Sequence, residues 1–331
     1  MMISRRWVLP LLAGIPLRRA SAPEDVPQEP RTRILFGGDV MLARYVGQLA
    51  RNKHDPALPF RQIAPVFQAA DLAFANLESP FSDGQSIWES RMVFRAGPEM
   101  IAGLEMAKIA VVSTANNHAR DCGSRGIEFT LEWLQKHGIE AVGTGATAEA
   151  AHAGAVMERN GVRFGFLGYT YDQTNGNYRD TDDRIAGMDL GQMRDDVAAM
   201  RGRADVTIVS MHAGSEYSPK PNRQQSEFAR AAIDAGASVV AGHHPHVVQP
   251  WERYREGVIF YSLGNLVFDQ VQRAETQRGE LGEAVFAGSR IEEARVIPVK
   301  IAATAPRLIG SGDSAAPPAA DAGNQNEAGA K

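Results

Sequence analysis

The chain has 331 residues, 44% of them hydrophobic, with 35 basic and 39 acidic residues and a formal net charge of −4. This is the composition of a soluble globular protein with enough apolar residues for one large core or two modest ones, and it excludes a wholly disordered chain. Residues 1–22 hold four arginines and no acid, so the remainder carries 31 basic and 39 acidic residues, a net charge of −8 that argues against a nucleic-acid partner.

The N-terminus carries the pattern of an export signal. In Ser4–Leu9 an arginine pair directly precedes an apolar stretch, as in twin-arginine signals. The stretch is too short to span a bilayer, and Ala20-Ser21-Ala22 offers a small-residue cleavage pattern. We expect residues 1–22 to be a twin-arginine signal peptide and the mature protein to be periplasmic or otherwise extracytoplasmic. The alternatives are an uncleaved amphipathic anchor and a disordered basic tail.

The rest of the chain divides by composition. Residues 23–31 are rich in Pro and Glu and predict a linker, whereas residues 310–331 lack large apolar side chains and predict a disordered tail. Between them, over residues 32–305, strand and helix patterns alternate without an internal repeat. This alternation predicts one layered α/β domain whose sheet mixes parallel and antiparallel pairs.

Several elements are predicted individually. Met157–Tyr169 reads as a hairpin because Asn160-Gly161 suits a type I′ turn. Apolar residues at helical spacing and apolar runs predict the others. We expect helices over residues 123–137, 190–200 and 222–235, and strands over residues 258–262 and 294–301.

Five apolar runs of β type are each followed by a short polar cluster. Runs without polar alternation predict strands that are buried on both faces, and ligands bind at the carboxyl ends of such strands. Asp, Glu, Asn and His gathered there are the ligands of a hydrolytic metal centre, so a metal site is the leading hypothesis. The runs and their clusters are Ile34–Phe36 with Asp39, Leu72–Ala75 with Asn76 and Glu78, Ile109–Val112 with Asn116–His118, Val206–Met211 with His212, and Val239–Ala241 with His243, His244 and His246.

The first two clusters supply carboxylates. Asp39 is either a metal ligand or a turn and N-cap residue for a helix near Ala43, and the company of the other clusters favours the ligand. Asn76 and Glu78 point to the same side if the strand continues, because strand side chains alternate. We expect Glu78 to bind metal or to orient a ligand, unless one of the pair caps the turn at Ser79-Pro80.

The third cluster combines a neutral ligand with an acid. Asn117 offers an amide oxygen to a metal, and His118 is able to protonate a leaving oxygen. Asp121 either orients His118 or N-caps the helix from Gly123, and the sequence leaves both open. Cys122 is the only cysteine, which rules out an intrachain disulfide, and a buried incidental residue is favoured over a nucleophile.

The remaining histidines complete the predicted ligand set. His212 is either a metal ligand or a hydrogen-bonded core residue, and the other clusters favour the ligand. His244 and His246 are spaced so that both rings can approach one metal site or two adjacent ones, the alternative being a surface cluster. Basic side chains near the motifs, among them Arg91, either clamp an anion or are solvated. We expect substrate-binding side chains at Arg44, Asn76, Arg95, Glu216, His243 and Asn265.

In this order, the motifs resemble the CapA (PGA_cap) family, which is linked to bacterial poly-γ-glutamate capsule synthesis. The similarity covers roughly residues 32–302. That family in turn resembles the calcineurin-like metallophosphoesterases, which implies a four-layer αββα sandwich with mixed sheets. The matching stretches are Phe36–Arg44, Ala75–Ser79, Thr114–Asp121, Val209–Tyr217, Gly242–Val247 and Ser262–Asn265.

The resemblance also implies roles for single residues. It assigns Asp39 as the first metal ligand, Glu78 or Asn76 as the bridging one, and His118 as the catalytic histidine. The remaining ligands are then Asn117, His212, His244 and His246. The chain departs from the superfamily where Asp-x-His becomes Asp39-Val40-Met41 and where Gly-Asp becomes Asn-Leu-Glu. We therefore expect one or two divalent ions: manganese, zinc or iron.

The predicted function is metal-dependent hydrolysis of a phosphoester by an exported protein of capsule, poly-γ-glutamate or other envelope polymer biosynthesis. Metal-activated water attacks the ester while His118 protonates the leaving group. The alternative is a non-catalytic scaffold with a degenerate metal site, which the missing histidine at Met41 favours. A third reading is hydrolysis of an amide or γ-glutamyl link. The expected partners are an anionic polymer or a phosphorylated small substrate, together with membrane-bound capsule synthase subunits.

Overall fold

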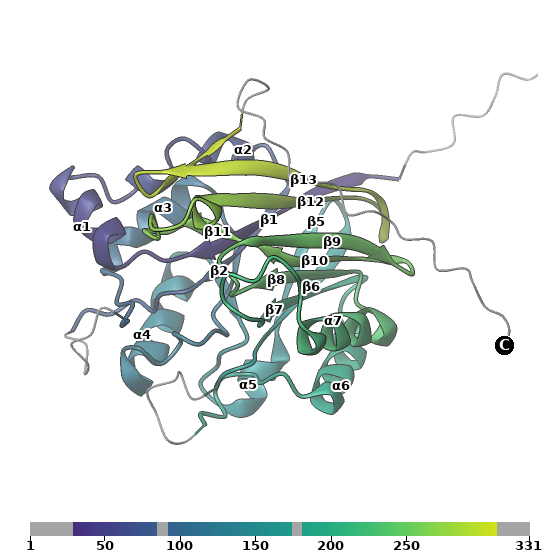
Figure 1. Ribbon diagram of the computed structural model, residues 1–331. Coiled ribbons are helices and arrows are strands. Elements are labelled where there is room, and N and C mark those ends of the chain that lie inside the picture. The colour runs from purple at the N-terminus through teal and green to yellow at the C-terminus, as the bar shows by residue number, and fades with distance from the viewer. Residues whose placement is uncertain (1–28, 85–91, 174–180, 310–331) are drawn as a thin grey trace, which may run out of the picture.

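A computed structural model of the chain describes residues 29–84, 92–173 and 181–309. The predicted signal peptide, most of the predicted linker, Arg91 and the predicted tail lie outside these ranges. Two β-sheets are stacked face to face, and helices cover the outer face of each (Figure 1). The predicted four-layer αββα sandwich is therefore confirmed. Among the described residues, no helix combines the length and the apolar character that a membrane crossing requires.

The first sheet has eight strands in the order β14-β13-β12-β1-β2-β3-β4, with β11 paired to β1. The four strands from β1 to β4 are parallel, and β12 to β14 extend the sheet in antiparallel fashion. The strands are β1 (Arg31–Val40), β2 (Leu72–Leu77), β3 (Val111–Ser113), β4 (Glu140–Val142), β11 (Asn265–Val267), β12 (Arg278–Ala287), β13 (Arg290–Ala302) and β14 (Ala305–Leu308).

The second sheet has six strands in the order β5-β6-β7-β8-β10-β9, again mixing both pairings. The predicted hairpin is confirmed: β5 and β6 pair antiparallel, and Asn160 and Gly161 both have the positive φ, 53° and 78°, that a type I′ turn needs. The strands are β5 (Ala155–Arg159), β6 (Val162–Thr170), β7 (Val206–His212), β8 (Val239–His243), β9 (Val248–Tyr254) and β10 (Gly257–Leu263).

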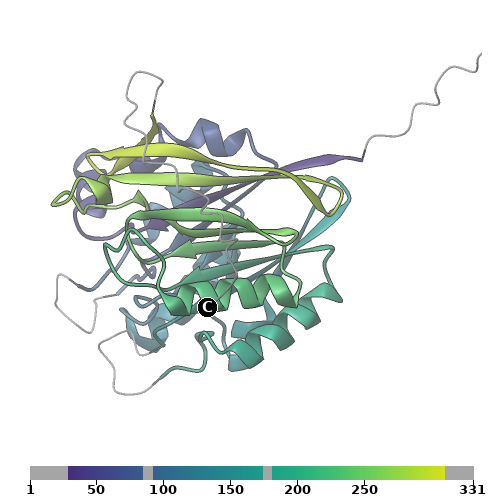
Figure 2. The same ribbon diagram turned by 45° about the vertical axis from the view of Figure 1, so that its right-hand side comes forward.

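Helices α1–α4 pack on the first sheet and α5–α7 on the second, where α6 and α7 lie side by side (Figure 2). Their bounds confirm the three predicted helices, and Asn222 begins α7 with a capping box. The helices are α1 (Arg44–Asn52), α2 (Ala64–Gln68), α3 (Ile101–Met106), α4 (Gly123–Lys136), α5 (Ala148–Ala153), α6 (Leu190–Arg201) and α7 (Arg223–Ala235), with 3₁₀ turns at Leu58–Phe60, Pro98–Met100 and Glu275–Gln277.

The layer between the sheets is apolar and aromatic. Phe36 and Phe74 of the first sheet meet Phe166 and Phe260 of the second, with ring centroids 5.8 to 6.1 Å apart. Burying each such ring stabilises the fold by roughly 1.5–3 kcal/mol. This rigid layer fixes the carboxyl ends of β1, β2, β7 and β8 relative to one another, and those ends carry the predicted site.

The end of β1 is bent toward the site by a glycine. The register between β1 and β2 shifts between Phe36 and Asp39. A Cβ on Gly38 would lie 2.0 Å from the carbonyl oxygen of Gly264, and the same oxygen accepts the Asp39 amide at 3.0 Å. Glycine is therefore required at position 38, because any side chain would separate β1 from the chain that carries Asn265.

Candidate metal centre

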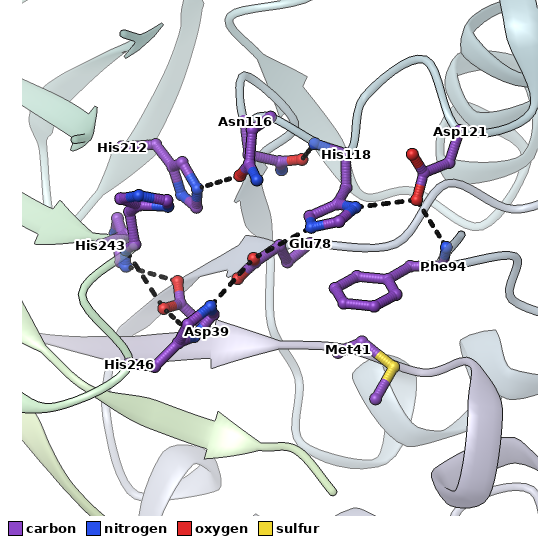
Figure 3. Close-up of polar contacts among 12 residues, drawn as sticks. Asp39, Met41, Glu78, Phe94, Asn116, His118, Asp121, His212, His243 and His246 are labelled. Atoms are coloured by element: carbon purple, nitrogen blue, oxygen red, sulfur yellow. Dashed lines mark hydrogen bonds and ion pairs between the residues drawn. The ribbon is translucent and has the colours of Figure 1, made fainter. Parts of the chain in front are cut away.

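Three buried side chains from different strand ends converge at this edge of the first sheet. Asp39, Glu78 and His246 each offer a ligand atom, and these atoms all lie within 4.8 Å of one another (Figure 3). His246 stands between the two carboxylates. Its Nε2 is 3.6 Å from Glu78 Oε1, and its Nδ1 is 3.5 Å from Asp39 Oδ2. Such a set of oxygen and imidazole donors is what a divalent transition metal takes.

Glu78 shows that the cluster fits a cation. Its carboxylate is fully buried, and neither oxygen has a hydrogen-bond partner among the described residues. Burial, followed by the nearby charges of Asp39, Glu216 and Asp121, raises the pKa of Glu78 well above its usual value. A buried carboxylate without hydrogen bonds is costly, and a divalent ion held by Glu78 and His246 would remove that cost. The donor set therefore fits a divalent metal.

Asn265 determines which nitrogen of His246 is free. The Nδ1 of His246 donates to Asn265 Oδ1 at 2.9 Å. The orientation of the Asn265 amide, with Oδ1 toward His246, is itself fixed because its Nδ2 donates to the Thr276 carbonyl at 3.0 Å. His246 therefore presents an unprotonated Nε2 on the side of Glu78, which is the form that binds metal. Asn265 is fully buried behind His246.

Asp39 is held in place from three sides. Its Oδ1 accepts from Asn76 Nδ2 at 2.8 Å, and its Oδ2 accepts from the His244 amide at 3.2 Å. Burial raises the pKa of Asp39, but the hydrogen bond from His246, the electrostatic interaction with the His243 and His246 rings and the Asn76 bond together hold it below its usual value. Asp39 thus faces the centre as an ionised carboxylate and does not cap a helix.

His243 and Asn76 lie behind Asp39. His243 is fully buried, its Nδ1 is 3.5 Å from Asp39 Oδ1, and its ring faces Phe74 in the layer between the sheets. Burial lowers the pKa of His243 to about 4, so the ring is neutral at physiological pH. Asn76 is also fully buried. Both residues, which were expected to bind substrate, are placed where they support Asp39.

A second group of donors lies beside the first. Asn117 Oδ1 is 2.8 Å from His212 Nε2, and the His212 and His244 rings are 4.9 Å apart. Burial and the neighbouring histidines lower the pKa of His212 well below its usual value, and burial lowers that of His244 to about 3. Neutral imidazoles are metal ligands, so Asn117, His212 and His244 form a set suited to a second ion.

The turn that carries His244 and His246 is strained. Both residues have positive φ angles, 96° and 57°, which residues other than glycine rarely adopt. Such strain persists only where the surroundings impose it, and it concentrates at functional sites. In this chain it turns the two rings of the His244-Pro245-His246 segment toward the two ligand groups.

His118 faces the first ligand group from the opposite side. Its Nδ1 lies 2.8 Å from Asp121 Oδ2, and its Nε2 lies 3.9 Å from Glu78 Oε1. The same Asp121 oxygen accepts the Phe94 amide at 2.5 Å, and the Phe94 ring stacks on His118 at 3.8 Å. Asp121 therefore orients His118 and does not cap α4, whose N-cap residue is Cys122, with no side-chain capping bond.

Cys122 takes no part in this arrangement. It is buried, and burial together with the charge of Asp121 raises the pKa of its thiol to about 11. A protonated thiol is a poor nucleophile, so the predicted incidental role agrees with its surroundings.

The rim of the centre carries residues of mixed character. Arg44 forms an ion pair with Asp269, and its guanidinium lies 4.8 Å from the Phe94 ring centroid. Arg95 is exposed and donates to the Gly84 carbonyl at 2.6 Å. Glu216 is exposed and near enough to raise the pKa of Glu78. Arg44 and Glu216 are thus at the rim, whereas Arg95 is engaged elsewhere.

Three residues at the rim of the centre were not predicted from the sequence. Tyr171 lies directly after β6, with its ring 4.7 Å from that of His244. It obeys the same strand-end rule as the predicted ligands. Phe94 and Arg273, which lies 4.7 Å from the Tyr217 ring, come from connecting segments that follow no such pattern.

The motif order is matched by a family model. The model described as "Bacterial capsule synthesis protein PGA_cap" matches residues 33–270. The chain belongs to this family. Its PGA_cap segment holds every proposed metal ligand, so the centre is part of the family's own region.

Two proteins that are similar to this chain have names from capsule or PGA biosynthesis. "PGA biosynthesis protein CapA" of Bacillus subtilis is 34% identical over 239 residues, which cover 71% of this chain and 63% of that protein. "Capsule biosynthesis protein CapA" of Bacillus anthracis is 30% identical over 280 residues, 80% of this chain and 68% of that protein. This chain thus spans less than two thirds of the B. subtilis relative.

Solved structures support the fold of this PGA_cap chain. The NAD nucleotidase of Haemophilus influenzae superposes with a TM-score of 0.51 at 11% sequence identity, over 86% of this chain and 55% of that chain. At this identity the likeness concerns the fold alone, which is metallophosphoesterase-like.

Met41 marks a departure of this PGA_cap chain from the metallophosphoesterase pattern. It stands where that pattern places a histidine ligand, yet its side chain points away from the centre (Figure 3). Met41 is fully buried in the apolar cluster outside the first sheet, and its sulfur accepts the Ala43 amide at 3.2 Å. The ligand group around Asp39 therefore consists of Asp39, Glu78 and His246.

Proposed function

We propose that this PGA_cap-family chain is an exported, metal-dependent phosphoester hydrolase of capsule, poly-γ-glutamate or other envelope polymer biosynthesis. The observation that carries the hydrolase is the buried Glu78 carboxylate, which accepts no hydrogen bond from the described residues and lies between His246 and His118. The pathway is supported by the named CapA relatives, and export by the twin-arginine pattern of residues 1–22.

Six side chains would hold the metal. Asp39, Glu78 and His246 suit a first divalent ion, and Asn117, His212 and His244 suit a second. When bound, such an ion polarises the phosphoester and lowers the pKa of water. The protein keeps two of these donors neutral, because burial lowers the pKa of His212 and His244.

His118 is the proposed general acid. Its Nε2 faces the centre, while Asp121 accepts from its Nδ1 and so fixes the orientation of the ring. The Phe94 ring covers one face of the imidazole and limits its motion. The proton passes from His118 Nε2 to the leaving oxygen, a contribution of typically 10²–10⁴-fold in rate.

The rival function is a non-catalytic scaffold that binds an anionic polymer or partners a membrane-bound synthase. One observation favours it: Met41 packs in the core where the related enzymes have a ligand. In that case the metal, if present, is structural.

Metal content and turnover together separate the two functions. The purified mature protein is analysed for bound metal after reconstitution with manganese, zinc or iron, and assayed with a chromogenic phosphodiester. We expect one or two equivalents of metal and turnover, both lost in His246→Ala and retained in His54→Ala, a matched change at an exposed histidine. Metal without turnover supports the scaffold, and absence of metal contradicts the proposed centre. Cell fractionation of a tagged Arg5→Lys/Arg6→Lys variant tests export, which this change should abolish.

A further inference from the structure

A cavity of about 320 Å³ lies next to the metal centre, beyond the end of β6. Tyr171 lines the cavity, and its ring centroid is 4.7 Å from that of His244. We call it the Tyr171 pocket and define it by Tyr171 together with His152, Gln173, Asp189 and Gln192.

Two of these side chains are fixed by a buried carboxylate. Asp196 accepts from His152 Nδ1 at 2.7 Å and from Gln192 Nε2 at 2.7 Å. Since a carboxylate only accepts, the bonded nitrogens must both be donors. The Tyr169 hydroxyl donates to Asp196 as well, at 2.8 Å, so the carboxylate is fully engaged.

The other two polar side chains are fixed by the backbone. Gln173 Nε2 donates to the Ile185 carbonyl at 2.6 Å, and its amide packs where a Cβ on Gly187 would stand. Asp189 is the N-cap of α6, and its Oδ1 accepts the Gln192 amide at 2.8 Å. The pocket is therefore preorganised, which lowers the entropic cost of binding.

These bonds determine the chemistry that is left for a ligand. Gln173 and Gln192 have each used one amide N–H and keep a second N–H and a carbonyl oxygen, and Asp189 has used one of its two carboxylate oxygens. No lysine or arginine is among the described residues that line the pocket. The remaining acceptors are the carbonyl oxygens of Gln173 and Gln192 and Oδ2 of Asp189.

We propose that the Tyr171 pocket binds a primary ammonium group of the substrate, so that the phosphoester cleaved at the metal centre belongs to an amine-bearing molecule. This rests on the proposed hydrolase. An ammonium group offers three donors and no acceptor, which complements the remaining acceptors and the charge of Asp189. The exposed Tyr171 ring adds a face for cation–π contact. A second anionic group in the pocket would meet the charge of Asp189 with no lysine or arginine among the described lining residues to offset it, and is disfavoured.

The test compares ligands that differ only in the amine. ω-Aminoalkyl phosphates of two to six carbons and n-alkyl phosphates of equal overall length are titrated calorimetrically into the manganese-loaded protein. We expect the best amine to bind about tenfold more tightly than its alkyl match, the scale of one charge-assisted hydrogen bond. In Asp189→Asn, which keeps an oxygen able to N-cap α6, the preference for the amine should fall to about one- to threefold. Asp195→Asn, an exposed residue of α6 outside the pocket, should leave it unchanged.

Equal affinities of the two series for the wild-type protein would overturn the proposal, as would a ratio that Asp189→Asn leaves intact. If neither series binds, the proposed hydrolase fails. In that case 1,4-diaminobutane and 1,4-butanediol are titrated into the same protein. A preference for the diamine that Asp189→Asn removes supports the pocket, and equal or absent binding of the two overturns it.

Discussion

Asn265 Oδ1 accepts the Nδ1 proton of His246 at 2.9 Å, and this bond decides which nitrogen of the ring can bind a metal. We predict that Asn265→Leu weakens metal binding about 10–100-fold, the usual effect of losing such a support. Asn265→Asp keeps an acceptor oxygen and should retain most of the affinity. Metal titration with a competing chelator measures the difference, and equal affinities for wild type and Asn265→Leu would contradict the role.

Asp121 should act on the rate and not on metal binding. In Asp121→Asn an amide replaces the carboxylate that accepts from His118 Nδ1, so the ring is held less firmly with Nε2 toward the centre. We expect kcat to fall by about 10²-fold or more with KM changed little. Bound metal, measured on the same sample, should stay at the wild-type level. Loss of metal in this variant would show a structural role instead.

The part of this candidate centre that could be predicted from the sequence is the part that depends only on where the strands end. Asp39 and Glu78 lie at the ends of parallel strands β1 and β2 of the first sheet, and His212 and His246 at or after the ends of parallel strands β7 and β8 of the second. Strand ends alone therefore place each pair, and this rule needs no knowledge of side-chain directions. The bond from Asn265 could not be predicted, since it depends on the close contact at Gly38 and on an amide held by Thr276. Those are tertiary facts that leave no local pattern.

The fold was predictable for a similar reason. Helices α4, α6 and α7 follow from apolar spacing, and the hairpin from Asn160-Gly161, because each depends on nearby residues. The Tyr171 pocket was not predictable. It joins the ends of β6, α5 and α6, whose approach is set by packing against the second sheet.

Acid should destabilise the metal-free protein through its buried histidines. Burial lowers the pKa of His243 to about 4, below the value of about 6.5 for an unfolded chain. Between these values the unfolded state binds the proton and the folded state does not, so stability is lost as the pH falls. This one group accounts for up to about 3 kcal/mol across that window, at 1.36 kcal/mol per unit.

His243→Gln removes that contribution. The variant should lose less stability than the wild type between pH 7 and pH 4, although its stability at neutral pH is lower because the ring's packing against Phe74 is lost. Urea unfolding of both metal-free proteins at several pH values gives the comparison. Parallel pH profiles would show that His243 is not neutral in the folded protein.

Met41→His tests whether the missing ligand can be restored by sequence alone. The Met41 side chain points into the apolar cluster outside the first sheet and is fully buried, so a histidine there would be desolvated away from the ligand group around Asp39. We expect no additional equivalent of bound metal and a loss of stability of about 1–3 kcal/mol, the cost of burying an unpaired polar group. Elemental analysis and thermal unfolding measure the two effects on one preparation. Met41→Leu, an apolar change of similar volume, should cost less than about 1.5 kcal/mol and serves as the matched control. An added equivalent of metal in Met41→His, lost again when Asp39 is changed to Ala, would instead show that this end of β1 can turn its side chain toward the centre.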